Sequence, residues 1–187
     1  MLHEASGRHG SLGPEIRPAW PGARLAGPCI TVRAAAGDNL AAHHAIERTQ
    51  PGEVICLAAP AGALFGVWGE ITTSSARQRG AAGLVTSCAV RDVDVIESLG
   101  LPVFAAATTI QGTIKHNPGT HDVPIRIGRA LILPGDWIVA DADGCVVIPA
   151  DRLADIVETA ERKVTIETRV LAEIEAGASS RNALTLP

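Results

Sequence analysis

The sequence predicts a single α/β domain of mixed sheets with helices on one side. Short apolar segments rich in Val and Ile alternate with Ala-rich segments of helical periodicity, and Gly and Pro separate them at short intervals. The chain has 187 residues, of which 47% are hydrophobic, so one domain can bury a substantial core.

Strands are expected where β-branched residues lie between turn-forming residues. The first four fall at residues 26–34, 54–59, 83–87 and 101–107. A loop rich in Gly, Thr and Pro follows over residues 108–122. Three further strand candidates have the sequences PIRIG, ALIL and DWIVADADGCVVIP, the last with a hairpin turn at Ala-Asp-Gly.

Helices are expected after most of these strands. One starts at Asp38 as N-cap and stops at a Pro-Gly pair, and two more cover residues 69–79 and 92–99, each followed by a glycine. A long amphipathic helix spans residues 151–176. The domain is expected to cover residues 1–177, with an irregular tail over residues 178–187.

Composition excludes several classes of function. The net charge is −4 with no basic run, and the chain has no Tyr and only two Phe, so we expect no nucleic-acid partner. No apolar run approaches the roughly 20 residues of a membrane helix, and the start lacks the apolar segment of a signal peptide. We therefore expect a cytoplasmic protein whose scattered cysteines are buried apolar residues, with Cys88, which precedes the candidate site, as the exception.

A glycine-containing loop leads into the helix that begins near residue 69. Gly62, Gly66 and Gly69 let backbone approach a ligand closely, and the N–H groups of the first turn, Gly69 to Thr72, favour a carboxylate or phosphate. The spacing matches no nucleotide-binding motif. The alternative is a tight loop without a ligand.

The next strand-to-helix junction carries Arg91 and Asp92. Asp92 could act as a helix N-cap with Arg91 in a surface ion pair, which is the ordinary structural explanation. The functional alternative makes Asp92 an oxygen ligand for Mg²⁺ or Mn²⁺ and Arg91 a donor to a carboxylate or enolate oxygen.

Glu167 interrupts the apolar face of the long helix, formed by Leu153, Val157, Ala160, Val164, Leu171 and Ile174. Either it reaches water, or this face packs on a neighbouring subunit and presents Glu167 to its site. A zinc site built on His, a serine nucleophile and a Schiff base on Lys115 or Lys163 have weaker support.

The chain resembles a known enzyme family over residues 2 to about 177. The resemblance is carried by LHEASGRHGSLGPEIRPAWPGARLAGPCITV, GDNLAAHHAIERTQPGEVI, WGEITTSSARQRGAAGLV, RDVDVIESLGLPVF and PGDWIVADADG. These segments are similar to the 4-hydroxy-4-methyl-2-oxoglutarate / 4-carboxy-4-hydroxy-2-oxoadipate aldolases, within the superfamily of regulator of ribonuclease activity A (RraA).

The resemblance implies a single-domain β/β/α swivelling-type fold assembled as a homotrimer or homohexamer, with sites at subunit interfaces. It implies metal-dependent retro-aldol cleavage of 4-hydroxy-2-oxo di- or tricarboxylic acids to pyruvate and a second oxo-acid, with oxaloacetate decarboxylation as a side activity. Two alternatives stay open: a non-catalytic regulator that binds a ribonuclease, and a lyase for another small oxo-acid.

Residue roles follow from the resemblance. It places the metal ligand on Asp92, the substrate-binding arginine on Arg91 and the acid that holds metal-bound water on Glu70. The backbone of Gly69, Glu70, Ile71 and Thr72 would grip the pyruvyl carboxylate. Glu4 and Glu167 match two acids that are lent to the neighbouring subunit.

Two departures from the family pattern stand beside this site. Most members have Asp-Gly where this chain has Ser87-Cys88, and an Asp where it has Ala58. Since glycine adopts positive φ freely and Cys does not, we expect a different turn before Arg91.

Overall fold

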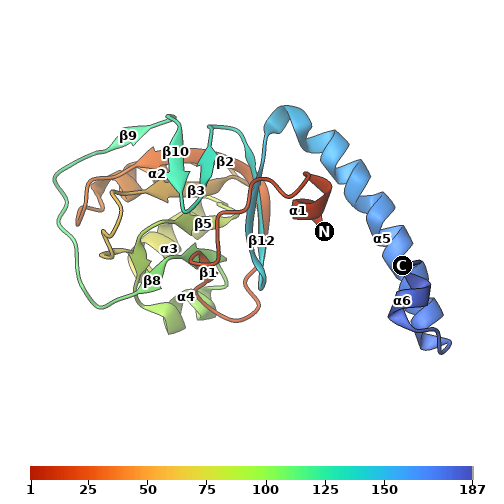
Figure 1. Cartoon of the computed structure of the whole chain (residues 1–187). Coiled ribbons are helices and arrows are strands. Elements are labelled where there is room, and N and C mark those ends of the chain that lie inside the picture. The colour runs from red at the N-terminus through yellow and green to blue at the C-terminus, as the bar shows by residue number, and fades with distance from the viewer. Residues whose placement is uncertain (187) are drawn as a thin grey trace. The chain divides into compact units, whose positions relative to one another are not determined.

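The computed structural model describes residues 1–186, which form two compact units (Figure 1). The larger unit is residues 10–150, and the smaller unit combines residues 1–9 with the chain from residue 151 onward. The larger unit carries the predicted strands and three of the predicted helices, which confirms the α/β class. The predicted domain limits of 1–177 stay a prediction.

The larger unit is organised around one long curved sheet. Its strand order is β1-β7-β5-β3-β2-β12-β13, and β9 pairs with β2. The pairs β2–β3, β3–β5 and β5–β7 are parallel, whereas β12 runs antiparallel to both β2 and β13. The strands are β1 (Arg17–Pro18), β2 (Leu25–Arg33), β3 (Val54–Ala58), β5 (Gly83–Thr86), β7 (Val103–Ala105), β9 (Thr120–His121), β12 (Trp137–Asp141) and β13 (Gly144–Ile148).

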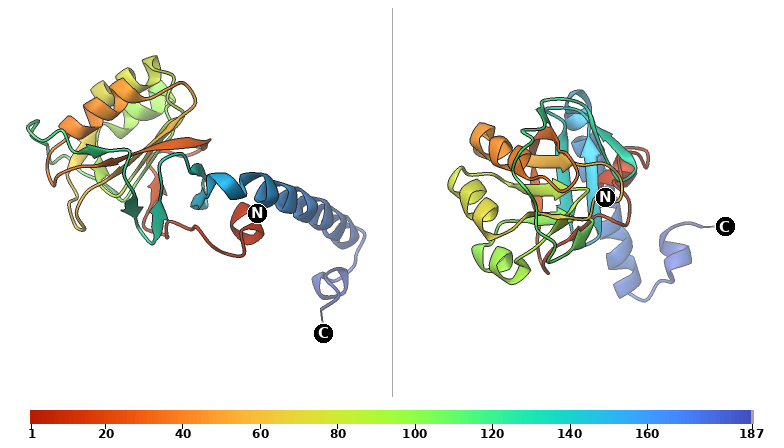
Figure 2. Two further views of the ribbon diagram at one scale, coloured as in Figure 1. Left: turned by 90° about the horizontal axis from the view of Figure 1, so that it is seen from above. Right: turned by 90° about the vertical axis from the view of Figure 1, so that its left-hand side faces the viewer.

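Three helices cover one face of the parallel strands (Figure 2, left). They are α2 (Leu40–Arg48), α3 (Glu70–Gln78) and α4 (Val93–Leu99), within one or two residues of the predicted limits. Each packs small or β-branched residues, such as Ala45, Ala76 and Ile96, onto Ile55 and Leu84 of the sheet. The helices therefore lie on one side, as the sequence predicts.

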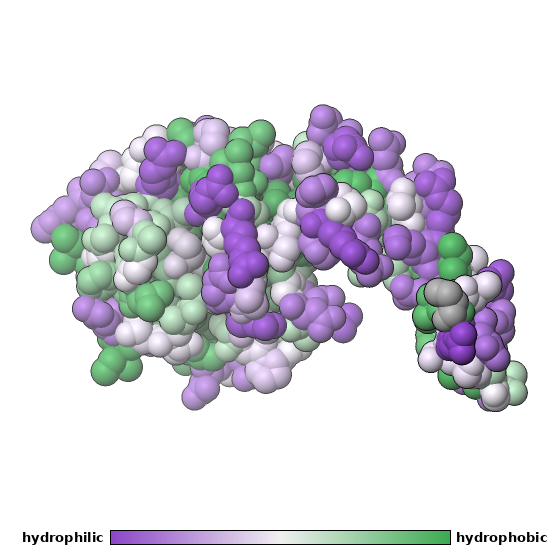
Figure 3. Space-filling view, viewed as in Figure 1, coloured by the Kyte–Doolittle hydropathy of each residue, from purple (hydrophilic) through white to green (hydrophobic). Residues whose placement is uncertain are grey.

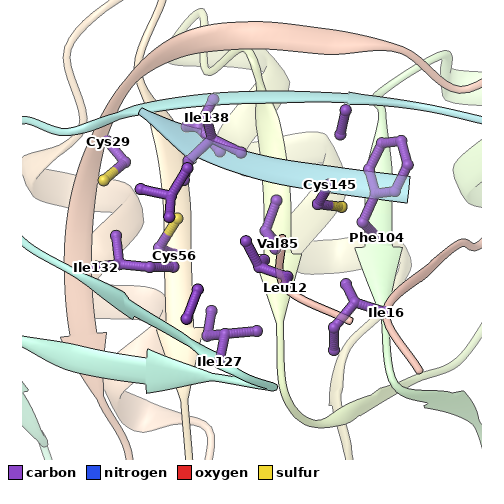
Figure 4. Close-up of a cluster of buried hydrophobic side chains, with 14 of the residues drawn as sticks. Leu12, Ile16, Cys29, Cys56, Val85, Phe104, Ile127, Ile132, Ile138 and Cys145 are labelled. Carbon is purple, nitrogen blue, oxygen red and sulfur yellow. The ribbon is translucent and has the colours of Figure 1, made fainter. Parts of the chain in front are cut away.

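The other face encloses a second core, shown in Figure 4. The sheet curls until β1 contacts β13, and the short antiparallel pair β10 (Ile125–Ile127) and β11 (Ala130–Ile132) packs against it. Cys29, Cys56 and Cys145 lie in this core as buried free thiols, and Cys88 is buried on the helix side. The structure thus agrees with cysteines acting as small apolar residues.

A second, small parallel sheet positions the candidate site. Its order is β4-β6-β8, with β4 (Gly66–Trp68), β6 (Ala89–Val90) and β8 (Ala107–Thr108). These strands follow β3, β5 and β7 along the chain, so each extends beyond the carboxyl end of a main strand. The start of α3 follows β4 and the start of α4 follows β6, which brings two helix N-termini to one edge.

The smaller unit contains α1 (Leu2–Ala5), the long α5 (Leu153–Glu175) and α6 (Ser180–Ala183). A short 3-10 turn, Ala150–Arg152, precedes α5. The helix α6 corrects the expectation of an irregular tail, because Ser179 caps it by accepting the Asn182 N–H. Among residues 1–186, no helix is both long and apolar enough to cross a membrane.

Candidate active site at the starts of α3 and α4

The carboxylate of Asp92 joins the two helix starts. Asp92 precedes α4, but its side chain accepts no N–H from that helix. Instead its Oδ2 accepts the backbone N–H of Glu70, at the start of α3, over 3.0 Å. The prediction of Asp92 at the N-cap position of α4 is correct. Its side chain, however, caps α3 and not α4.

The backbone of Asp92 has left-handed dihedral angles, with φ 57° and ψ 41°. Asp is one of the few non-glycine residues that tolerate this region, and such conformations gather at functional sites. The turn directs the carboxylate across to α3, away from its own helix. One oxygen is occupied by Glu70, and Oδ1 has no hydrogen-bond donor within residues 1–186.

Arg91 lies beside this carboxylate. Its Nε is 3.6 Å from Asp92 Oδ2, and its backbone N–H donates to the carbonyl of Trp68 at the end of β4. The side chain is 47% exposed, and its terminal Nη atoms have no ion-pair or hydrogen-bond partner in the described part of the chain. A fork of donors is therefore directed to solvent next to a carboxylate oxygen that is also free.

Gly69 makes this close approach feasible. A Cβ atom at Gly69 would overlap Asp92 Oδ2 and would lie 3.0 Å from Arg91 Cγ. The φ of Gly69 is −163°, an extended conformation that any residue adopts. Glycine is therefore needed here for lack of space and not for its backbone conformation. Gly66 is similar, since a Cβ there would lie 3.1 Å from the Gln111 carbonyl oxygen and 3.4 Å from Arg91 Cδ.

The first turn of α3 is held rigidly from within. Trp68 is buried and its Nε1 donates to Thr73 Oγ1 over 2.8 Å. The Thr72 hydroxyl accepts the Gly69 N–H over 2.9 Å. The first intrahelical bond runs from the Thr73 N–H to the Gly69 carbonyl, so the N–H groups of Ile71 and Thr72 lie ahead of it, in the positions that favour an anion.

The predicted site residues therefore divide into two groups. Gly69, Glu70, Ile71, Thr72, Arg91 and Asp92 come together at the two helix starts. The side chains of Glu70 and Ile71 are exposed, and that of Thr72 is buried. Glu4 and Glu167 belong to the smaller unit, where Glu4 lies 3.4 Å from Lys163 and Glu167 is exposed on α5.

The turn that contains Ser87 and Cys88 has no left-handed residue, as expected for a Cys in place of Gly. Ser87 Oγ accepts the N–H of Ala59 over 3.1 Å, which joins the ends of β3 and β5. Burial raises the pKa of the Cys88 thiol against the smaller opposing effects of Thr86, Ser87 and Ala59. Cys88 is therefore a neutral, buried thiol.

Sequence reasoning missed the long-range hydrogen bonds of the two polar residues that precede α2. The sequence predicts Asp38 as a helix cap, and it does accept the Leu40 N–H, but its other oxygen also accepts the N–H groups of His116 and Asn117. Burial raises its pKa, and these three backbone donors outweigh that effect, so the pKa of Asp38 is lowered. The one local signal of these longer-range contacts was the presence of two adjacent polar residues, Asp38 and Asn39, where one residue is enough to cap a helix.

A family model described as RraA-like, Aldolase/RraA, matches residues 1–147. A protein of Halalkalibacterium halodurans, provisionally named a 4-hydroxy-4-methyl-2-oxoglutarate aldolase, is 36% identical over 82% of this chain and 73% of its own length.

Two solved structures are also similar. An uncharacterized protein of Pseudomonas syringae pv. tomato is 30% identical with a TM-score of 0.86, over 98% of this chain and 87% of that one. The RNA-processing inhibitor RraA of Thermus thermophilis is 26% identical with a TM-score of 0.72, over 79% and 90% of the two chains.

Proposed function

The chain belongs to the RraA-like, or Aldolase/RraA, family, and from this premise we propose that it is a divalent-metal-dependent lyase. Its substrates would be 4-hydroxy-2-oxo di- or tricarboxylic acids, cleaved to pyruvate and a second oxo-acid. The observation that carries the proposal is the convergence of three features: an Asp92 carboxylate with one free oxygen, the Arg91 Nη donors, which have no partner within residues 1–186, and the start of α3.

The residues present fit a hard divalent cation such as Mg²⁺ or Mn²⁺. Asp92 Oδ1 has no donor in the described part of the chain, and the Asp92 side chain is partly exposed, so this oxygen is available to a cation. No cluster of three or more His, Cys, Asp or Glu surrounds it within residues 1–186. A single carboxylate with water and substrate oxygens suits Mg²⁺, which retains several waters when bound to proteins.

A bound cation would supply Lewis-acid polarisation of the 2-oxo group. The protein supplies the rest. The N–H groups of Ile71 and Thr72 would bind the 1-carboxylate at the positive end of the α3 dipole. Arg91 would donate to the 2-oxo oxygen, on which negative charge develops as the C3–C4 bond breaks.

Proton transfer completes the cleavage. A base removes the proton of the C4 hydroxyl, and C4 becomes a carbonyl as the C3–C4 bond breaks. The C3–C4 electron pair forms the C2=C3 bond, and the C2=O π pair moves to the oxygen, which gives the enolate. Protonation of the resulting enolate at C3 then gives pyruvate. Glu70, exposed at the start of α3, would hold the water that relays this proton, with a second acid from a neighbouring copy.

A neighbouring copy would supply Glu4 and Glu167. In the smaller unit, α5 exposes Val157, Val164 and Leu171, and Figure 3 shows apolar residues among hydrophilic ones at the molecular surface. Exposed apolar residues along one helix are typical of subunit contacts. We propose a homotrimer or homohexamer, in which mixing the Arg91→Ala and Glu167→Gln chains would restore activity that neither variant has alone.

Two other functions have some support. The similarity to an RNA-processing inhibitor favours a protein-binding regulator as second candidate. The same enolate chemistry would also serve decarboxylation of oxaloacetate, since loss of CO₂ leaves the same pyruvate enolate.

Pyruvate release measured with lactate dehydrogenase tests the proposal. The protein would be assayed on 4-hydroxy-4-methyl-2-oxoglutarate, 4-carboxy-4-hydroxy-2-oxoadipate and oxaloacetate, with Mg²⁺, Mn²⁺ or EDTA. We expect release that depends on added metal. No release from any of these acids under any metal condition, together with capture of a ribonuclease, would favour the regulator instead.

A further inference from the structure

Strand β4 contains an irregularity directly before the candidate site. Gly66 pairs with Ala89, and Trp68 pairs with Val90, so two steps along β4 correspond to one step along β6. Val67 is the extra residue, which makes this a β-bulge. A bulge leaves a backbone group without its ladder partner, and it sets the direction in which the following residues leave the strand.

The Asn39 side chain contacts the bulge. Its Nδ2 donates to the carbonyl oxygen of Val67 over 3.1 Å, and both residues are buried. Asn39 comes from the start of α2, and its backbone N–H donates to the Ile114 carbonyl. Asn39 lies outside the small sheet, and its amide donates the hydrogen bond that the Val67 carbonyl lacks within the irregular strand pairing.

Burying the polar Asn39 side chain lowers stability, which indicates that this residue has more than a packing role. Asn39 is 8% exposed, and its Oδ1 is buried without a hydrogen-bond partner in the described part of the chain. An unsatisfied buried amide oxygen is destabilising, whereas an apolar side chain of similar size is not. Within residues 1–186, the hydrogen bond to Val67 is the one polar contact that the Asn39 side chain makes.

The three residues that follow the bulge contact Arg91 and Asp92. The next residue, Trp68, accepts the Arg91 N–H through its carbonyl over 2.9 Å. Gly69 then faces Asp92, and the Glu70 N–H donates to the Asp92 carboxylate. A shift of β4 by a fraction of an ångström would therefore move the α3 start and Arg91 together.

We propose that Asn39 is a positioning residue for the lyase site: its amide fixes the bulge at Val67 and thereby sets the distance between the α3 start and Asp92. The proposal rests on the proposed function for its effect on turnover. The geometric part, from Asn39 through Val67 to Glu70, is independent of any reaction.

The test compares the Asn39→Asp chain with a matched control. Asn39→Asp keeps the size of the side chain but removes the N–H donor. Thr49→Val removes a buried hydrogen bond at the other end of the same helix, from Thr49 Oγ1 to the Ala45 carbonyl. Thermal melting of both chains establishes that each is folded at the assay temperature.

Two readouts decide the outcome. Turnover of Asn39→Asp should fall by about 10²-fold with a smaller change in KM, because a small misplacement of catalytic groups has this effect. The loss should shrink as the pH is lowered, since a neutral carboxylic acid again donates to Val67. Amide hydrogen exchange of Glu70 and Arg91, followed by NMR, should accelerate in Asn39→Asp and stay at the wild-type rate in Thr49→Val.

The two proposals fail in different ways. A wild-type chain that releases no pyruvate overturns the proposed function, and the exchange rates alone then decide on Asn39. Wild-type turnover and wild-type exchange at Glu70 in a folded Asn39→Asp chain would show that Asn39 does not position the site. Equal loss of turnover in Thr49→Val would assign the effect to general stability and overturn the positioning role.

Discussion

Gly69 and Asp92 approach so closely that a Cβ atom at Gly69 would overlap Asp92 Oδ2. We therefore expect Gly69→Ala to separate the α3 start from the carboxylate and to lower turnover by roughly 10²-fold. Affinity for Mn²⁺, measured by electron paramagnetic resonance, should fall as well. Gly112→Ala is the control, because nothing lies within 4 Å of a Cβ there. Full activity in Gly69→Ala would contradict the assigned geometry.

Arg91 should be essential for turnover and dispensable for stability. Arg91→Ala removes the donor fork, and we expect a loss on the order of 10²-fold or more in kcat. Arg91→Lys should recover only part, because an ammonium cannot reproduce the planar fork. Its ion pair with Asp92 is half exposed and contributes about 0–1 kcal/mol, so urea unfolding should change little. Arg162→Ala, which removes an exposed ion pair on α5, should turn over normally.

Asp92 offers two variants with different expected effects. Asp92→Asn keeps an oxygen for the Glu70 N–H and tolerates the left-handed backbone, so we expect a folded protein with metal affinity lowered at least about tenfold. Asp92→Ala loses both features and should also lose about 1 kcal/mol or more of stability. Isothermal titration with Mn²⁺ and urea unfolding measure the two effects. Unchanged Mn²⁺ affinity in Asp92→Asn would place the metal elsewhere.

Asp38 should make stability depend on pH. Its pKa is lowered in the folded protein, so its contribution is fully present above the unfolded pKa of about 3.8 and is lost as the pH falls through the folded pKa. Asp38→Asn should therefore be less stable than wild type at about pH 7, and the difference should narrow toward about pH 3. Urea unfolding at both pH values checks this. A difference that widens in acid would contradict the three backbone hydrogen bonds assigned to Asp38.

The four thiols should be unreactive in the native protein. All four are buried, and burial, together with the smaller effect of Asp141 and against that of Arg17, raises the pKa of Cys145 to about 12. Thiolate formation at neutral pH is therefore suppressed. Ellman's reagent should titrate no thiol in the folded chain at about pH 8 and four in guanidinium chloride. Rapid reaction of one thiol before unfolding would show that its surroundings open readily.

Local pattern was enough to predict the helices and the longer strands of the larger unit, but not the two- and three-residue strands β1, β4, β6 and β9, the last of which lies within the loop expected over residues 108–122. Helices α2, α3 and α4 lie where caps and glycines placed them, because those signals are carried by residues that adjoin each other in sequence. The grouping of Gly69 to Thr72 with Arg91 and Asp92 also followed, since carboxyl ends of parallel strands share one edge.

Tertiary contacts decided the rest. The Asp92 side chain caps α3 in place of α4, because its left-handed backbone directs it across the sheet edge. The bulge at Val67 and the role of Asn39 depend on contacts between segments 28 residues apart, which no local pattern encodes. The single turn of α6 was missed because the tail is too short to display a helical period.

The small sheet β4-β6-β8 has a consequence for how the protein folds. Its strands are parallel, so each must wait for a crossover helix to dock before it finds its neighbour, and such non-local pairings form slowly. Val67, Trp68 and Val90 of these strands are buried in the same core as α2, α3 and α4, so the reactive edge forms in the same slow step as that core. Gain of activity should therefore coincide with the burial of Trp68 when the unfolded protein is diluted from denaturant.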